Sequence, residues 1–172
     1  MDFALISYIM SLVATVLGFI EPFSKKMKTV LLISLGVNLL FGLSYLLVGS
    51  YSGCITCATA CVQLIINYTY NVRCKRLPWW LIAIYCLSFV MVNLFAFEHW
   101  YDVLAILASV SFALSISQTR TFVYRLLALL KYLLWVSYDL ASASYGPLFS
   151  HIMLSVLFIY CIWLRGRKHQ TD

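Results

Sequence analysis

Charged side chains are scarce in this chain, and their scarcity argues against a soluble protein. Asp, Glu, Lys and Arg make up only 10% of the 172 residues, whereas 63% of the residues are hydrophobic. A soluble domain of this size has too little interior to bury so much apolar surface. Because a helix needs roughly 20 apolar residues to cross the hydrocarbon core of a membrane, the chain has room for about seven spans and little else.

Sequence signals of linkers, signal peptides and catalytic sites are missing as well. The sequence contains no Gly/Ser-rich linker and no low-complexity segment, which predicts a single membrane domain over residues 1–172. The first residues, Met1-Asp2-Phe3-Ala4, lack the positive charge of a cleaved signal peptide, so we expect the first span to be retained. No nucleophile–base pair, metalloprotease motif, phosphate-binding loop or adjacent carboxylate pair occurs, so we expect neither an enzyme nor a cofactor. His151 and Asp139 leave intramembrane catalysis open as an alternative.

Seven apolar runs are separated by short polar or turn-forming segments. Pro78 and Pro147 stand where the first turn of a helix tolerates a missing N–H. Gly49, Gly53 and Gly146 predict tight turns between spans. The sequence therefore predicts an all-α integral membrane protein with transmembrane helices over about 4–23, 28–48, 52–72, 78–97, 101–118, 122–142 and 145–165.

The basic residues follow alternate spans and predict the orientation of the chain. We attribute the net charge of +6 to cytoplasmic loops rather than to nucleic-acid binding, because loops rich in Lys and Arg stay inside. One of the intervening loops carries Glu98 and Asp102 instead. This pattern places the N-terminus outside and the C-terminus in the cytoplasm. The residues that decide it are Lys25, Lys26, Lys28, Arg73, Lys75, Arg76, Arg120, Arg125, Arg165, Arg167 and Lys168.

A short pattern occurs twice, 93 positions apart. Tyr45 with Gly53 recurs as Tyr138 with Gly146, and a serine precedes each tyrosine. The offset aligns the first three spans with the last three and leaves the fourth as a connector. Because one odd helix separates two three-helix units, both units cross the membrane in the same direction. We therefore expect two parallel repeats, about 4–72 and 101–165, a linker helix at about 78–97 and a short cytoplasmic tail at 166–172.

The residues at the repeated turns carry a resemblance to a known family. The segments 45–53 (YLLVGSYSG) and 142–146 (SASYG), together with the 3+1+3 layout, resemble the YgjV-type family of small bacterial inner-membrane proteins. That family is similar to the SWEET/PQ-loop superfamily of transporters, and Glu21-Pro22 lies at a place comparable to the superfamily's Pro-Gln dipeptide. The resemblance implies a SWEET-like fold, a location in the inner membrane and transport of a small metabolite.

Lys131 lies near the middle of the sixth predicted span. Placing an ammonium group there costs about 2.5–3.5 kcal/mol on insertion scales, so such a residue usually faces a cavity or a partner. Its repeat mate is Asn38, at the same depth in the second span. Two polar residues at matched depth predict a substrate site at the centre of the bundle. The alternative is a lysine that hydrogen-bonds across the bundle and fixes helix packing.

Aromatic side chains extend this predicted site. Trp135 and Tyr138 follow Lys131 at i+4 and i+7 and share its helix face, and Tyr45 is the mate of Tyr138. One cation beside aromatic rings suits a small ligand that is flat or bears an anionic group. Ordinary aromatic packing would give the same pattern.

Three further polar residues lie at depth in the predicted spans, and a fourth, Asp139, lies near their outer ends. Gln63, Asn93 and His151 either line the substrate site or form single interhelical hydrogen bonds, worth about 0.6 kcal/mol each. Asp139 lies about 12 Å along the helix axis from Lys131, near the outer interface, where we expect it to be solvated.

Cys54, Cys57 and Cys61 share one helix face. A C-x-x-C pair with a third cysteine can bind a soft metal ion. No fourth cysteine or histidine follows at ligand spacing, so we expect small apolar side chains that pack, and no metal.

The predicted function is transport of a small polar metabolite by alternating access between the two three-helix units. Three alternatives remain open, one of which is the vitamin-binding component of an energy-coupling transporter, a class that usually has six spans. A receptor of the same fold would bind a ligand without moving it, and a membrane assembly subunit would need a protein partner. We expect the lipid bilayer as the surroundings and no nucleic-acid partner, and the sequence is compatible with oligomers.

Overall fold

The computed structural model describes residues 3–47, 51–95, 97–142 and 145–168, which form seven α-helices and one short 3-10 helix and contain no strand. The predicted all-α arrangement is confirmed, and the helices begin and end within a few residues of the predicted positions. They are α1 (Phe3–Gly18), η1 (Glu21–Phe23), α2 (Met27–Leu47), α3 (Tyr51–Val72), α4 (Trp79–Leu94), α5 (Asp102–Ile116), α6 (Thr121–Ala141) and α7 (Tyr145–Lys168).

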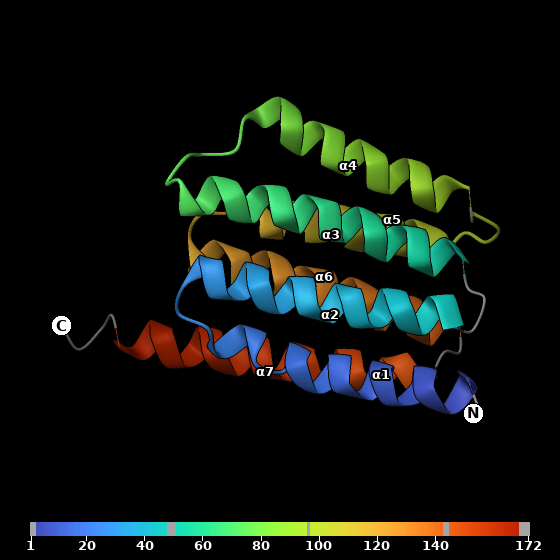
Figure 1. The fold of residues 1–172 in the computed structure, drawn as a ribbon. Coiled ribbons are helices and arrows are strands. Elements are labelled where there is room, and N and C mark those ends of the chain that lie inside the picture. Colours follow the sequence, from blue (N-terminus) through green and yellow to red (C-terminus); the bar gives the residue numbers. More distant parts are fainter. Residues whose placement is uncertain (1–2, 48–50, 96, 143–144, 169–172) are drawn as a thin grey trace.

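The helices lie side by side in two layers (Figure 1). In one layer α1, α2, α3 and α4 follow one another, and in the other α7, α6 and α5 lie behind α1, α2 and α3. Consecutive helices of a layer pack together, and contacts of α3 with α5 and of α7 with η1 join the layers. Helix α4 packs mainly against α5. Helix α6 is therefore the middle helix of its layer, with α2 in front of it.

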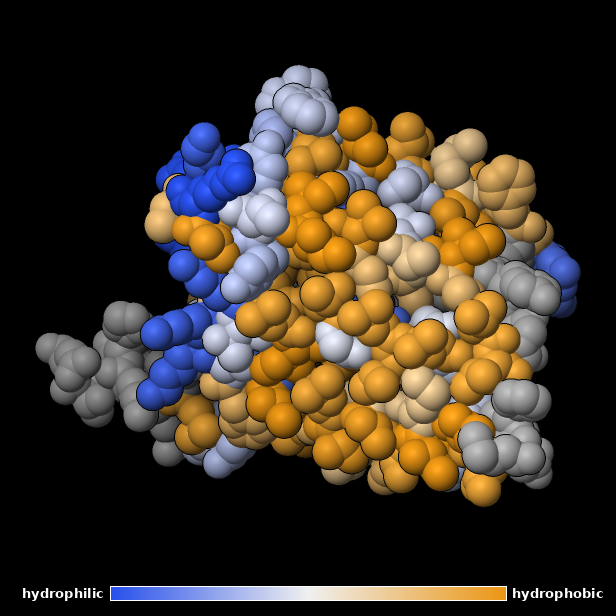
Figure 2. All heavy atoms as spheres, in the orientation of Figure 1, coloured by the Kyte–Doolittle hydropathy of each residue, from blue (hydrophilic) through white to orange (hydrophobic). Residues whose placement is uncertain are grey.

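The chain reverses direction at each link, so the bundle has two distinct ends. At one end, the basic end, the exposed residues include Lys25, Lys26, Lys28, Arg73, Lys75, Arg76 and Arg120. Figure 2 shows hydrophilic residues gathered there, beside the start of α2 and the link from α3 to α4, whereas the middle of the bundle is hydrophobic. The opposite end holds the acidic link with Glu98, which is also exposed.

Helix α1 ends earlier than the predicted range of 4–23 because of Pro22. A proline has no N–H to donate and its ring clashes with the carbonyl four residues earlier, which here belongs to Gly18. The last residue of α1 is Gly18, and Pro22 lies in η1 with its side chain buried. The chain thus enters the basic end as a tight 3-10 turn that exposes the carbonyl groups of Pro22 and Ser24 to α6.

Two of the three glycine turns predicted from the sequence are wrong. Gly53 lies in the first turn of α3 and Gly146 in the first turn of α7, so both helices begin before their glycines. The third, Gly49, lies outside the described residues. Pro147 likewise lies in the first turn of α7, as predicted.

The outward faces of the bundle are apolar. Side chains such as Leu12, Val62, Leu87 and Val156 are all more than half exposed, which is far more apolar surface than a soluble monomer shows. By length and hydropathy, two helical segments are sufficient to cross a membrane, Leu5–Phe23 and Met27–Leu47. Three shorter apolar helices accompany them, Trp79–Leu94, Asp102–Ile116 and Leu148–Leu164.

The interior contains two apolar clusters. The larger one joins α2, α3, α5, α6 and α7 and includes Leu31, Leu64, Ala128 and Phe158. The smaller one joins α3, α4 and α5 through Ala60, Tyr85, Phe89 and Ala113. Helix α6 contributes to the larger cluster, which places its polar side chains among apolar neighbours.

Candidate functional site

Most of the buried charge in the described residues lies on α6. Arg125, Lys131 and Asp139 are all at least nine-tenths buried, and they alternate with buried Tyr124, Ala128 and Tyr132. Arg125, Ala128, Lys131 and Tyr132 are separated by one turn of helix or less, and Asp139 follows Tyr132 by seven residues, or two turns, so they share the face of α6 that points into the bundle. The helix therefore carries three charged side chains into an apolar interior, which demands partners for each of them.

At the basic end, Glu21 and Arg125 join η1 to α6. Glu21 accepts hydrogen bonds from the Ser34 hydroxyl on α2 and from the Tyr124 hydroxyl on α6, the latter at 2.9 Å. Arg125 donates from Nε to the Pro22 carbonyl at 2.9 Å and from Nη2 to the Ser24 carbonyl at 2.6 Å. These bonds join parts of the chain about 100 residues apart and close the basic end of the bundle around the turn.

Lys131 lies deeper in the bundle, beneath aromatic rings. Its Nζ atom is 3.8 Å from the centroid of the Tyr132 ring and 5.2 Å from that of the Phe112 ring on α5. Both distances are within the range of cation–π attraction. Only 9% of Lys131 is exposed, so the ammonium group lies inside the bundle against these two rings.

Nearer the opposite end, Asp139 pairs with His151. The Asp139 carboxylate lies 2.7 Å from Nδ1 of His151 on α7, and Asp139 is 2% exposed. Trp135 stacks on the His151 ring with 5.7 Å between the ring centroids, and Tyr138 meets Trp135 edge-on. The Tyr132 ring lies between Lys131 and His151: its centroid is 3.8 Å from Lys131 Nζ and 6.0 Å from that of the His151 ring. Asp139 and His151 thus form an acid–imidazole pair, with Asp139 buried and His151 partly buried, that shares an aromatic neighbour with Lys131.

We call these five side chains the ionic network: Glu21, Arg125, Lys131, Asp139 and His151. Its members come from η1, α6 and α7, and aromatic side chains of α5, α6 and α7 fill the space between them. With a neutral imidazole, the two carboxylates balance the guanidinium of Arg125 and the ammonium form of Lys131. A protonated His151 leaves one positive charge in excess.

The structure brings together four of the eight substrate-site residues predicted from the sequence. Trp135, Tyr138 and His151 are joined by direct ring contacts, and the Tyr132 ring connects Lys131 to His151. Tyr45 lies within electrostatic range of Asp139 from the side of α2, and its ring stacks on Phe41.

The other three predicted residues make separate contacts. The Asn38 amide donates to the Ser34 carbonyl on its own helix at 2.8 Å. The Gln63 amide approaches the Ser88 hydroxyl on α4 at 3.4 Å, and the Asn93 amide donates to the Phe89 carbonyl at 2.7 Å. The Asn93 amide also approaches the Ser109 hydroxyl on α5 at 3.3 Å, so Gln63 and Asn93 join α4 to its neighbours rather than to the ionic network.

Four functional candidates were not among the predicted site residues: Glu21, Tyr124, Arg125 and Asp139. The expectation that Asp139 is solvated is wrong, because Asp139 is 2% exposed and its carboxylate contacts His151 on α7. Arg125 was assigned to the cytoplasmic charge pattern, whereas it is 1% exposed and bonded to the 3-10 turn. The i, i+3 and i+7 spacing of Arg125, Ala128 and Tyr132 was the signal that places Arg125 on the inner face.

The cysteine cluster has a packing role. No group of three His, Cys, Asp or Glu side chains in the described residues has a geometry suited to a metal ion. Cys57 and Cys61 are buried in the face of α3 that meets α2. A Cβ atom at Gly42 would lie 3.2 Å from the Cys57 Cβ, so α2 and α3 approach as closely as a glycine allows.

Of three comparisons with known proteins, one finds a match, to a family model. Neither the curated proteins nor the solved structures include a significant match to this chain. A sequence model of the Imp-YgjV family, described as a bacterial inner membrane protein, matches residues 5–169, a range that contains the whole ionic network. The apolar outer surface and the apolar helices agree with that description. The chain belongs to the Imp-YgjV family of bacterial inner membrane proteins.

Proposed function

We propose that this protein is a seven-span transporter that carries a small polar metabolite bearing a negative charge. The observation that carries the proposal is Lys131, a nine-tenths-buried ammonium group under two aromatic rings in the interior of a membrane protein. A charged side chain inside the membrane is costly and usually marks a pathway for substrate or ions. The substrate site would comprise Lys131, Trp135, Tyr138 and His151, with Tyr45 facing them.

The charge balance of the ionic network supports an anionic substrate. The network is neutral when His151 is neutral and carries one positive charge when His151 is protonated. An anion of single charge restores neutrality only in the second state. We therefore propose that His151 takes up a proton when the anion binds, so that anion and proton cross together.

Access to Lys131 supports a mechanism in which helices separate. Tyr132 and Phe112 cover the ammonium group, so a ligand reaches it only when α5 and α6 move relative to their neighbours. Helices α1 and α5 run in the same direction, as do α2 and α6, and α3 and α7 (Figure 1). This arrangement supports two parallel three-helix repeats in a SWEET-like 3+1+3 plan, with α4 as the linker, that rock against each other.

The proposed orientation places the basic end in the cytoplasm. Loops rich in Lys and Arg remain on the cytoplasmic side during membrane insertion. The N-terminus, which lies at the other end of α1, would then be outside the cell. The contacts of Glu21 and Arg125 would close the cytoplasmic side of the pathway in the conformation seen here.

The proposal is tested with the purified protein in liposomes. We expect uptake of a labelled small carboxylate, found by screening aliphatic and aromatic carboxylates for thermal stabilisation. Lys131→Ala should abolish both binding and uptake, while Lys26→Ala, which removes an exposed lysine, should keep both. Full uptake by Lys131→Ala would refute the site.

The same experiment separates the rival classes. Binding that depends on Lys131 but is not accompanied by counterflow would favour a receptor of this fold. No response to any carboxylate, together with a protein partner purified at fixed stoichiometry, would favour an assembly subunit.

A further inference from the structure

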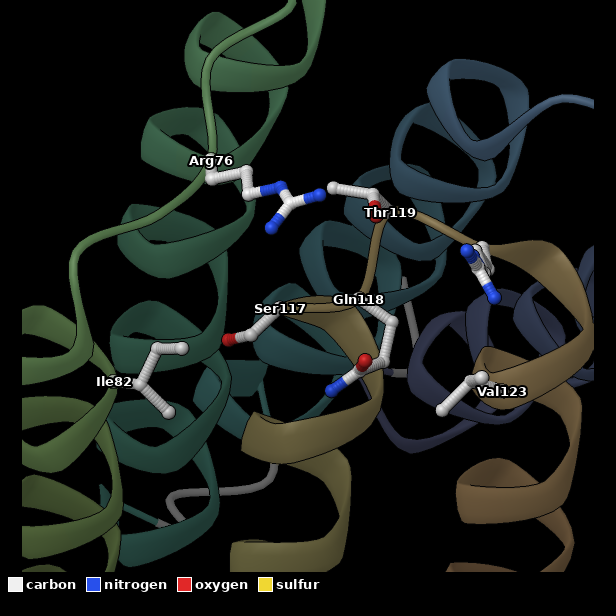
Figure 3. Close-up of a pocket in the computed structure, with 7 residues that line it drawn as sticks. Arg76, Ile82, Ser117, Gln118, Thr119 and Val123 are labelled. Atoms are coloured by element: carbon white, nitrogen blue, oxygen red, sulfur yellow. The ribbon is translucent and has the colours of Figure 1, made fainter.

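A polar hollow of about 370 Å³ lies at the basic end, separate from the ionic network. Two links form it: the segment between α3 and α4 supplies Arg76, and the segment between α5 and α6 supplies Ser117, Gln118, Thr119 and Arg120. In Figure 3 the Arg76 side chain extends from its link toward Thr119, and the Gln118 side chain lies between Ser117 and Val123. The volume is within the range of small-ligand sites.

The charged residues that line this hollow are all positive. Arg76 and Arg120 are both exposed, and their guanidinium groups face a space with no acidic lining residue. The acidic residues in the described part of the chain lie outside the hollow. Glu21 and Asp139 belong to the ionic network, and Glu98 and Asp102 share a hydrogen-bonded link at the opposite end. The two arginines therefore create a positive potential in the hollow, and no acidic residue in the described part of the chain lies there to neutralise it.

The shape of the lining matches an anion with several oxygen atoms. Guanidinium groups bind phosphate oxygens in pairs, and hydroxyl and amide groups add further donors around them. Thr119 provides a hydroxyl beside the two arginines, and the Gln118 amide, which donates one hydrogen to the Leu114 carbonyl at 3.0 Å, has a second hydrogen to donate.

The remaining wall is apolar and consists of Ile82 on α4 and Val123 on α6. It lies toward the bundle, and the exposed indoles of Trp79 and Trp80 stand at the start of α4, where aromatic side chains meet the membrane interface. A molecule with a phosphate group and an apolar portion fits this combination.

We propose that the hollow binds a phosphate group, carried either by the headgroup of an anionic phospholipid or by a soluble phosphate ester. Arg76 and Arg120 contact the phosphate oxygens, and binding joins the link between α3 and α4 to the link between α5 and α6. The site lies apart from Lys131, so it does not depend on the proposed transport function.

The test uses the full chain in a neutral detergent and two probes. Binding of phosphatidylglycerol is compared with that of phosphatidylcholine by native mass spectrometry, and binding of glycerol 3-phosphate is measured by calorimetry. The variant is Arg76→Gln with Arg120→Gln. The matched control is Arg73→Gln with Lys75→Gln, which removes two exposed positive charges near the same link but does not touch the hollow.

We expect the variant to lose roughly tenfold in affinity for each arginine, since each charge-assisted pair contributes on that order. The control should stay within about twofold of the wild type. Loss of phosphatidylglycerol binding alone identifies a lipid headgroup, and loss of glycerol 3-phosphate binding identifies a soluble ester. Equal losses in variant and control would overturn the proposal, as would absence of glycerol 3-phosphate binding together with no preference for anionic phosphatidylglycerol over zwitterionic phosphatidylcholine.

Discussion

Replacing Arg125 by methionine should separate the 3-10 turn from α6. Methionine preserves much of the length and the apolar stem of the side chain but removes both donors. The carbonyl groups of Pro22 and Ser24 then lose bonds of 2.9 and 2.6 Å. Arg125 is 1% exposed, so water does not replace these bonds without a change in the packing of α6.

The size of the effect follows from the number of bonds and their surroundings. Interhelical hydrogen bonds in membrane proteins contribute about 0.6 kcal/mol on average and up to about 1.7 kcal/mol each. Two such bonds give a loss of about 1–3 kcal/mol in the free energy of unfolding. Arg125→Lys keeps the positive charge, but an ammonium group lacks the planar guanidinium geometry that reaches both carbonyls. We therefore expect about half of the loss in unfolding free energy.

The assay is unfolding by a denaturing detergent in mixed micelles, followed by tryptophan fluorescence. Arg120→Met is the matched control, because this exposed arginine on the neighbouring link should change stability by less than about 0.5 kcal/mol. If Arg125→Met is as stable as Arg120→Met, the bonds to the turn contribute nothing and the proposed closure of the basic end is refuted.

Three further predictions concern the opposite half of the bundle, the contact of α2 with α3, and the orientation. A double-mutant cycle of Asp139→Asn and His151→Gln should show a coupling of about 0.5–3 kcal/mol in unfolding, and a value near zero would contradict their pairing. Gly42→Leu should destabilise the protein by about 1–3 kcal/mol through overpacking, as read from the unfolding midpoint, and an unchanged midpoint would contradict the close approach of the helices. A membrane-impermeant thiol reagent should label Glu98→Cys in intact spheroplasts but not Lys26→Cys, both in a background without Cys74, and the reverse result would invert the orientation.

Helix positions could be predicted from the sequence because membrane helices leave a strong local signal. Apolar runs of sufficient length, punctuated by charges and prolines, predicted all seven α-helices of the described chain. Turn chemistry was a weaker guide: Gly53 and Gly146 have helical neighbours on both sides, and a glycine at the start of a helix looks the same in sequence as one in a turn.

The candidate site could be predicted only in part, since partners come from helices distant in sequence. Lys131 stood out because a lysine in an apolar run is costly wherever it faces. Asp139 lies at the end of the same run, and no local pattern indicates its burial or its contact with His151 on α7. The role of Glu21 was equally hard to predict, since its hydrogen-bond donors Ser34 and Tyr124 come from two other helices.

When the two proposed repeats are aligned, charged or titratable residues of the second repeat correspond to apolar residues in the first. At the offset of 93, the mates of Arg125, Asp139 and His151 are Leu32, Leu46 and Ala58. The ionic network is therefore built on the second unit, and the first unit contributes Glu21 from its turn. A ligand bound by Lys131 would remain with α6 and α7 while α2 and α3 supply an apolar surface that slides past it. In the proposed transport cycle the hydrogen bond of Glu21 to Tyr124 would break and re-form, as would the bonds of Arg125 to the Pro22 and Ser24 carbonyls, because both sets join the first unit to the second.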